Sequence, residues 1–352
     1  MHTLFGEDVI AAIADRVKSR AGTPAGSALG KTAAACKEAF ALGCQGPDIF
    51  YHSRRRRPVG LEYGTLLHRR GIGRFAAGLL NMALPQPPEN GIDERGAYAL
   101  GFMTHAILDR SAHPFIVYKS FRAAPPAPNS LSYAQSHAFF ERVIDTLMFK
   151  TLRGAEIAEW DQEGILSAVC AEPPPGLQEM IAAALISAFP ERAEKDEKLK
   201  RRIENTFLDC ASFYRMTAQA NVARQILSIP PELHKDHLVY ICPEILTENP
   251  DFLNRGKRPW FYPAGAAKED TRSFPEIYAQ AAAQAVDSLS PIIAGYFETG
   301  VFPVDQAAEA VGNGGLSIVD EAGHPCPPCR SDPFPLDETL EQQVIIRRAK
   351  IN

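Results

Sequence analysis

The chain has 352 residues and a net charge of −5, with 45% hydrophobic and 22% charged residues. This is the composition of a globular protein with enough apolar residues for a substantial core, not that of a disordered chain. The negative charge and a pI near 6.0 argue against a general nucleic-acid-binding protein, which would carry a surplus of basic residues.

The sequence also indicates a compartment. Glu7, Asp8 and Asp15 interrupt the first thirty residues, where a secretory signal would be apolar, and no apolar run of about 18 residues could span a membrane. The seven cysteines have no regular spacing, which favours free thiols in a reducing environment. We therefore expect a soluble cytoplasmic protein.

Helices account for most of the chain in the predicted secondary structure. Val9, Ile10, Ile13 and Val17 recur at three- and four-residue steps, the spacing of an amphipathic helix. Gly46-Pro47-Asp48 lies in a predicted loop over residues 44–58. By the same criteria, helices are expected at about 5–20, 28–43, 60–82, 94–112 and 132–152, with two or three over 177–225 and one at 274–298.

Strand-like alternation is scarce and no internal repeat is visible. The sequence therefore predicts an all-α protein, a multi-helix bundle over residues 1–305. An irregular C-terminal tail, rich in Gly, Pro and charged residues, is expected over residues 306–352.

Three polar residues stand four apart in the segment GFMTHAILDRSAHPF: His105, Asp109 and His113. Four helical residues advance about 400°, so the three side chains fan over about 80° of one helix face. His137 and Glu141, in SHAFFERV, repeat the four-residue step. A single polar residue of this kind is more often hydrogen-bonded within the protein. Five of them in a run rich in apolar residues favour a metal site, because His and carboxylate are preferred zinc ligands.

Further motifs precede this helix in a definite order. They are MHTLFGEDV with His2, GCQGPDIFYH (43–52) with Asp48, and GTLLHR (64–69) with His68. From residue 2 to about residue 145 the ordered set resembles the zinc-dependent phospholipase C family, whose helical fold is shared with the P1-type nucleases.

The resemblance implies a centre of up to three zinc ions. Asp109 would bridge two of them, and the first ion would be completed by Asp48, His68 and His105. His2 and the N-terminus would serve the second ion, and His113, His137 and Glu141 would bind the third. Asp48 would also orient the attacking water, which makes it the candidate catalytic residue.

The chain departs from the secreted members of that family in two places. Pro114 follows His113 directly, and because a residue before proline is biased away from helical geometry, the helix is expected to end near Ser111 with His113 on a turn. In addition, His2 follows Met1 directly, whereas a mature N-terminal residue grips one zinc in the secreted enzymes. Three alternatives are open: the Met1 amine substitutes for that residue, the N-terminal site is weak or empty, or the chain starts further upstream.

Three functions remain open at this stage. The first is a zinc-dependent phosphodiesterase that hydrolyses phospholipids, with transient contact to a membrane surface. The second is a P1-like single-strand nuclease, which would need base-stacking aromatic residues along a basic groove. The third is a non-catalytic scaffold, in which zinc would be fully ligated by protein. The basic run 54–57, His52 and the Cys326–Cys329 pair are expected to be structural or solvated.

Overall fold

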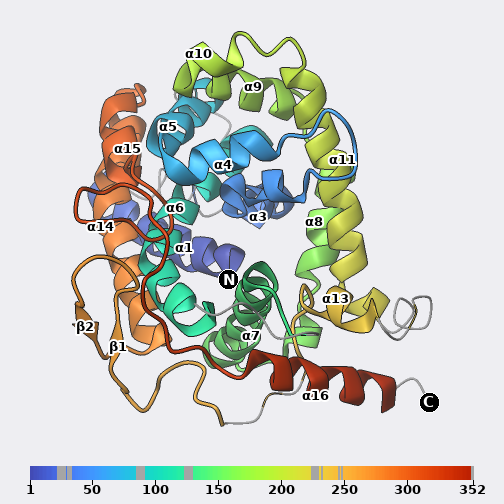
Figure 1. Ribbon diagram of the computed structural model, residues 1–352. Coiled ribbons are helices and arrows are strands. Elements are labelled where there is room, and N and C mark those ends of the chain that lie inside the picture. The colour runs from blue at the N-terminus through green and yellow to red at the C-terminus, as the bar shows by residue number, and fades with distance from the viewer. Residues whose placement is uncertain are drawn as a thin grey trace.

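The structure is a computed structural model, and the residues it describes are 1–21, 29, 34–84, 92–122, 130–222, 230, 233–244, 246 and 249–349. Two strands of two residues each, β1 (Trp260–Phe261) and β2 (Glu269–Asp270), form an antiparallel pair. The other regular elements of these residues are helices (Figure 1). The predicted all-α class is therefore confirmed.

Most helices follow one another with short connections, but residues 239–273 and 312–335 form long ones. In chain order they are α1 (His2–Ala21), α3 (Lys37–Cys44), the 3₁₀ helix η1 (Gly46–His52), α4 (Leu61–Arg69), α5 (Ile72–Ala83), α6 (Glu94–Ser120), α7 (Tyr133–Arg153), η2 (Ile157–Glu159), α8 (Gln162–Ala171), α9 (Leu177–Ala188), α10 (Pro190–Ala193), α11 (Leu199–Thr217), α13 (His234–Leu238), α14 (Phe274–Thr299), α15 (Val304–Val311) and α16 (Leu336–Ala349). None of the helices in the described ranges is long and apolar enough to cross a membrane.

Helix α6 is the centre of the bundle. It packs against α1, α3, α5, α7 and α14 (Figure 1), and it is buried on almost all sides. A helix that is apolar all round is typical of a protein core. The Asp93 side chain caps its N-terminus, because Oδ1 accepts a hydrogen bond of 2.9 Å from the Gly96 amide. Polar side chains on α6 are therefore presented to the interior of the protein.

The expectation that this helix ends near Ser111 is wrong. Helix α6 continues through Pro114 to Ser120, so His113 is helical. A proline inside a helix costs about 3 kcal/mol. Phe115, Ile116 and Val117, which follow it, are all buried, and each buried side chain of this size contributes about 1.5–3 kcal/mol. Packing therefore outweighs the local preference of the proline.

The helix predicted over residues 60–82 is divided into α4 and α5. The division falls at Gly71, which has a φ of 75°. The extended conformation of Arg70, with φ −168° and ψ 159°, ends α4, and Gly71, in a left-handed conformation that glycine readily adopts, is the N-cap of α5. His68 consequently lies in the last turn of α4 and not within a long helix. Of the helix predicted at 28–43, residues 28 and 30–33 lie outside the described residues, as do residues 223–225 of the segment 177–225.

The predicted C-terminal tail, residues 306–352, is only partly irregular. It contains α16, which buries Leu336, Leu340, Gln343 and Arg347 at steps of three and four residues. The buried Arg347 guanidinium pairs with Glu244 at 3.1 Å. Helix α16 has only a short apolar repeat. Because the residues before it are rich in Pro and Gly, the sequence pattern does not predict this helix.

Helices α3 and α6 cross at two glycines. A Cβ added at Gly43 would lie 2.0 Å from the Tyr98 carbonyl oxygen, and one added at Gly101 would lie 2.4 Å from the Phe40 carbonyl oxygen. The two backbones are therefore in direct contact. This contact brings the C-terminal end of α3, and the loop that follows it, against the middle of α6.

We expect Gly43→Ala to lower the free energy of unfolding by about 1–3 kcal/mol, because the added methyl group meets backbone atoms that cannot rotate away. Urea denaturation of the two proteins measures this difference. Gly295→Ala is the matched control, since a Cβ there has nothing within 4 Å. It should be neutral or stabilising by up to about 1 kcal/mol. Equal effects of the two changes would contradict the close contact.

Candidate metal centre

Helix α6 presents His105, Asp109 and His113 on one face, as their spacing predicts. His105 Nε2 lies 3.2 Å from Asp109 Oδ2, and His113 Nδ1 lies 3.5 Å from Asp109 Oδ1. The carboxylate therefore stands between the two imidazoles and turns one oxygen toward each. Asp109 is 3% exposed and His105 is fully buried.

The first group of donors consists of Asp48, His68 and His105, whose donor atoms all lie within 4.8 Å of one another. His68 Nε2 is 2.9 Å from Asp48 Oδ1 and 4.0 Å from Asp109 Oδ2. Asp48 comes from η1, which starts at Gly46. Gly46 has a φ of 54°, and its added Cβ would lie 2.3 Å from the His105 ring. Only glycine lets this turn come close enough to set Asp48 beside α6.

Backbone carbonyls orient both histidines of this group. His68 Nδ1 lies 2.8 Å from the Gly64 carbonyl oxygen, and His105 Nδ1 lies 3.1 Å from that of Cys44. A ring nitrogen that donates to a carbonyl is the protonated one, so the neutral ring keeps its lone pair on Nε2. Both Nε2 atoms face the carboxylates, which is the arrangement that metal-ligating histidines have.

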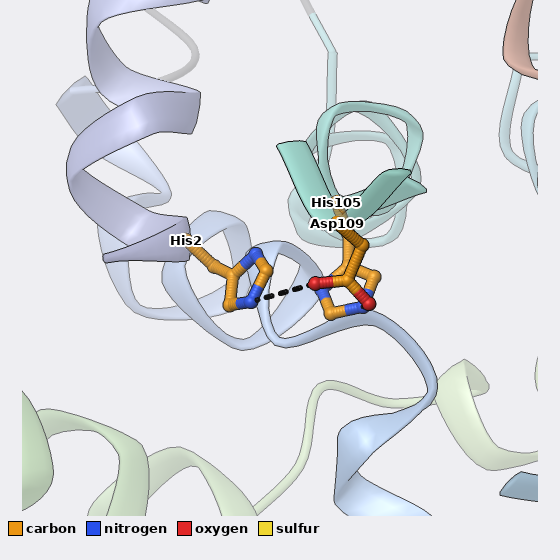
Figure 2. Close-up of side chains that lie close together, drawn as sticks. All are labelled: His2, His105 and Asp109. Carbon is orange, nitrogen blue, oxygen red and sulfur yellow. Dashed lines mark ion pairs between the residues drawn. The ribbon is translucent and has the colours of Figure 1, made fainter. Parts of the chain in front are cut away.

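A second group consists of His2, His105 and Asp109. His2 Nε2 lies 3.3 Å from Asp109 Oδ1 (Figure 2), and its ring stacks on that of His105 with centroids 4.1 Å apart. Met1 and His2 are partly buried and Thr3 is buried. The Met1 amine pairs with Asp145 at 2.6 Å. The first three residues are therefore packed into the bundle, which is the condition for His2 to serve as a ligand.

The third group consists of His113, His137 and Glu141. His137 Nε2 lies 3.2 Å from Glu141 Oε1, one turn further along α7, and His113 Nε2 lies 3.8 Å from the same oxygen. The His113 and His137 rings stack with centroids 5.4 Å apart. His113 Nδ1 lies 3.1 Å from the Asp109 carbonyl oxygen, so its Nε2 is turned to Glu141. This geometry depends on the helical conformation of His113.

The structure thus brings together all eight side chains that the sequence predicts as ligands. They come from five elements, which are α1, η1, α4, α6 and α7. Two neighbouring aromatic residues are missed by the sequence analysis. The Tyr51 ring lies 4.5 Å from that of His68, and the Tyr133 ring lies 5.8 Å from that of His137. Tyr51 follows Asp48 by one 3₁₀ turn and Tyr133 precedes His137 by one α-turn, so the helical spacing could have indicated both.

The charges of the group are strongly coupled. Burial opposes ionisation of Asp109, but His113 and His105 outweigh it and hold the pKa of this carboxyl well below its usual range. Burial likewise opposes the charged form of His105, yet Asp109 and Asp48 raise its pKa to about 9. Burial, together with the neighbouring His105, lowers the pKa of His2 to about 4. Asp109 is therefore anionic at neutral pH and His2 is neutral with a lone pair to donate, whereas His105 carries a proton on Nε2 that a bound cation would displace.

Two buried polar atoms fit a cation. His105 Nε2 and Asp109 Oδ2, which lie 3.2 Å apart, have no well-oriented hydrogen-bond partner in the part of the chain that the structure describes. Buried polar atoms are normally satisfied. A cation between His105 Nε2 and Asp109 Oδ2 would satisfy both atoms, and a set of imidazoles and carboxylates is the donor chemistry that zinc prefers.

The fold and these donors define a helical protein with zinc-type ligands clustered around a central helix. Comparison with family models identifies the family: the model described as zinc dependent phospholipase C matches residues 1–213, which include all eight candidate ligands. The chain belongs to the zinc-dependent phospholipase C family. Comparison with curated proteins and with solved structures gave no match.

Because Asp109 faces donors on both sides, its loss should affect more than one ion. We expect Asp109→Asn to lower the zinc content by more than His137→Ala, which removes a donor from the third group alone. Elemental analysis after dialysis against trace zinc measures the stoichiometry. Asp287→Asn is the control, since that side chain is 69% exposed on α14. An unchanged zinc content in Asp109→Asn would contradict the assignment.

A separate change tests the N-terminal donor. His2→Ala should lower zinc content and hydrolysis together while leaving the far-ultraviolet circular dichroism intact, because the helix core does not depend on this ring. His324→Ala removes a histidine that is 78% exposed in the tail and should change neither quantity. Full zinc content and full activity in His2→Ala would show that this residue is not a ligand.

Proposed function

We propose that the protein is a zinc-dependent phosphodiesterase of the phospholipase C type, which hydrolyses the phosphodiester bond on the glycerol side of a phospholipid. The observation that carries this proposal is the convergence of eight His, Asp and Glu side chains, the buried carboxylate of Asp109 among them. Membership of the zinc-dependent phospholipase C family supports it.

We propose a full set of three ions, divided among the residues as the resemblance implies. Asp48, His68, His105 and Asp109 would hold the first, and His113, His137 and Glu141 the third. His2 and Asp109 would hold the second, which the N-terminus would join once its amine leaves Asp145. Zinc bound by these residues would supply Lewis acidity, which lowers the pKa of water toward 7 and neutralises charge on phosphate oxygens.

Asp48 is the residue that we propose to orient the attacking water. Its side chain is 35% exposed, whereas that of Asp109 is 4% exposed, so Asp48 is the carboxylate of the first group that solvent reaches. Burial opposes its ionisation, but His105 and His68 hold the pKa of its carboxyl below the usual range. It is therefore an anionic hydrogen-bond acceptor at neutral pH. Oδ1 faces His68, and Oδ2 would accept the hydrogen bond from water.

The proposed reaction is an in-line displacement at phosphorus. The water oxygen forms a bond to phosphorus, the bond from phosphorus to the glycerol oxygen breaks, and the proton from water ends on the leaving alcohol. The products are a diacylglycerol-like alcohol and a phosphomonoester. His68 and His105 are held by backbone carbonyls, so the donors are oriented before substrate arrives.

We also propose a transient contact with a phospholipid surface, and no stable binding of nucleic acid. Tyr133 is 40% exposed although its ring lies next to His137, so an aromatic side chain stands at the edge of the ligand group. Tyrosine is enriched where an apolar surface meets water. A cytoplasmic location stays a proposal, based on the irregular spacing of the cysteines.

The decisive assay is hydrolysis of phosphatidylcholine vesicles with and without a zinc chelator. We expect activity that the chelator abolishes and added zinc restores. Asp48→Asn should lower kcat about 10²–10⁴-fold, the usual contribution of a residue that handles the proton. Release of phosphocholine measures the rate.

Two outcomes would favour the other functions. Hydrolysis of single-stranded DNA without hydrolysis of phospholipid would indicate a P1-like nuclease. Bound zinc without activity on either substrate would indicate a metal-binding scaffold.

A further inference from the structure

The segment after α15 makes an unusual set of contacts with Arg110, the residue that follows Asp109 on α6. The Arg110 guanidinium donates to four backbone carbonyls of this segment. Nη1 donates to the oxygen of Val311, Nη2 to those of Gly312 at 2.9 Å and Gly314 at 3.2 Å, and Nε to that of Gly315 at 3.3 Å. A guanidinium with its donors fixed on carbonyls holds the segment in one place relative to α6.

The same segment holds the end of α4. The Leu316 amide donates to the carbonyl oxygen of His68 at 2.9 Å, and the Gly71 amide donates to the carbonyl oxygen of Asn313 at 3.0 Å. His68 lies in the last turn of α4, where carbonyls lack partners within the helix. Leu316 is fully buried. The backbone of a proposed zinc ligand is therefore fixed by a residue about 250 positions later in the chain.

Helix α15 has no room to shift against α5. A Cβ added at Gly73 would lie 2.3 Å from the carbonyl oxygen of Ala308 and 2.7 Å from that of Gly312. These are backbone atoms, so the approach exists only because residue 73 is glycine. The segment 311–316 is thus held in place on one side by its close contact with α5 and on the other by its hydrogen bonds with Arg110. Figure 1 shows the long connection that leads from α15 down to α16.

We propose that residues 311–316 and Arg110 form a positioning clamp for the first group of zinc ligands. The clamp joins the backbone of His68 to the turn of α6 that carries Asp109, and so fixes the 4.0 Å separation of His68 Nε2 and Asp109 Oδ2. The clamp residues lie outside the matched range 1–213, apart from Arg110 itself. The inference rests on the proposed zinc centre but not on the proposed substrate.

The test measures how fast zinc leaves the folded protein. Full-length protein loaded with zinc is mixed with a chromophoric chelator well below the unfolding temperature. Arg110→Gln should release one zinc about 10–100-fold faster than the wild type, the usual effect of changing a residue that supports a metal ligand. The remaining zinc should leave at the wild-type rate. Arg110→Lys, which keeps the charge but not the fork of donors, should give an intermediate rate.

Asn313→Ala is the matched control within the clamp. Asn313 Oδ1 accepts a hydrogen bond of 2.9 Å from the Arg74 amide, so the change weakens the start of α5 without touching His68 or Arg110. Zinc release from this variant should match the wild type even if its unfolding temperature falls. Acceleration equal to that of Arg110→Gln would overturn the clamp, because it would show a general structural effect.

A second pair of variants leaves the ligand helix α6 unchanged. Gly73→Ala should displace α15 and accelerate zinc release, whereas Gly78→Ala on the same helix, with its nearest atom at 3.8 Å, should not. The visible spectrum of the cobalt-substituted protein should change in Gly73→Ala and Arg110→Gln only. Wild-type release rates and spectra in both would overturn the inference, while the zinc centre would stand. A wild-type protein that binds no zinc would overturn both.

Discussion

The buried carboxylate of Asp109 is the group around which the rest of the structure is arranged. An ion taken out of water costs several kcal/mol unless it is paired, and Asp109 lies on the most buried helix of the bundle. His105 and His113 stand one turn away on either side, and His2 reaches the same carboxylate from α1. The continuous helix through Pro114 and the glycine contact between α3 and α6 both serve to complete this environment.

The donors are far apart in sequence and meet only in the folded chain. His2 begins the first helix, Asp48 and His68 flank an arginine-rich loop, and His137 lies beyond α6. The buried Asp209 holds that loop, since its Oδ2 accepts hydrogen bonds from the amides of Arg54, Arg55 and Arg56. No such site exists in the unfolded chain, so binding of a cation and folding stabilise each other.

The sequence predicted the candidate ligands correctly from their spacing where they lie within one helix. The four-residue spacing of His105, Asp109 and His113 places three side chains on one face whatever surrounds the helix, and the structure shows them so. Asp48, His68 and His2 could be grouped with them only through the resemblance to a family, because nothing local says which turns and helix ends meet in space.

The wrong helix boundaries and the missed helix have one cause: tertiary packing overrides the local preferences from which they were predicted. The burial of Phe115, Ile116 and Val117 cannot be seen from the proline that precedes them. The break between α4 and α5 combines an extended Arg70 with a left-handed Gly71, and the mostly helical preferences of the surrounding residues do not predict it. Helix α16 was missed because its buried positions, Leu336 and Leu340, follow a proline-rich stretch. Nothing in the sequence singles out Arg110, since its four carbonyl partners lie about 200 positions away.

The two oxygens of Asp109 face different donor groups, and this has a consequence for how the centre fills. In the proposed zinc centre, one unit of negative charge would be shared between neighbouring ions, so a cation bound on one side of Asp109 would weaken the attraction for a cation on the other side. Occupancy would then be anticooperative. As free zinc falls, we expect the chains to pass through partly loaded forms over a broad range of concentration, with no sharp change from full to empty.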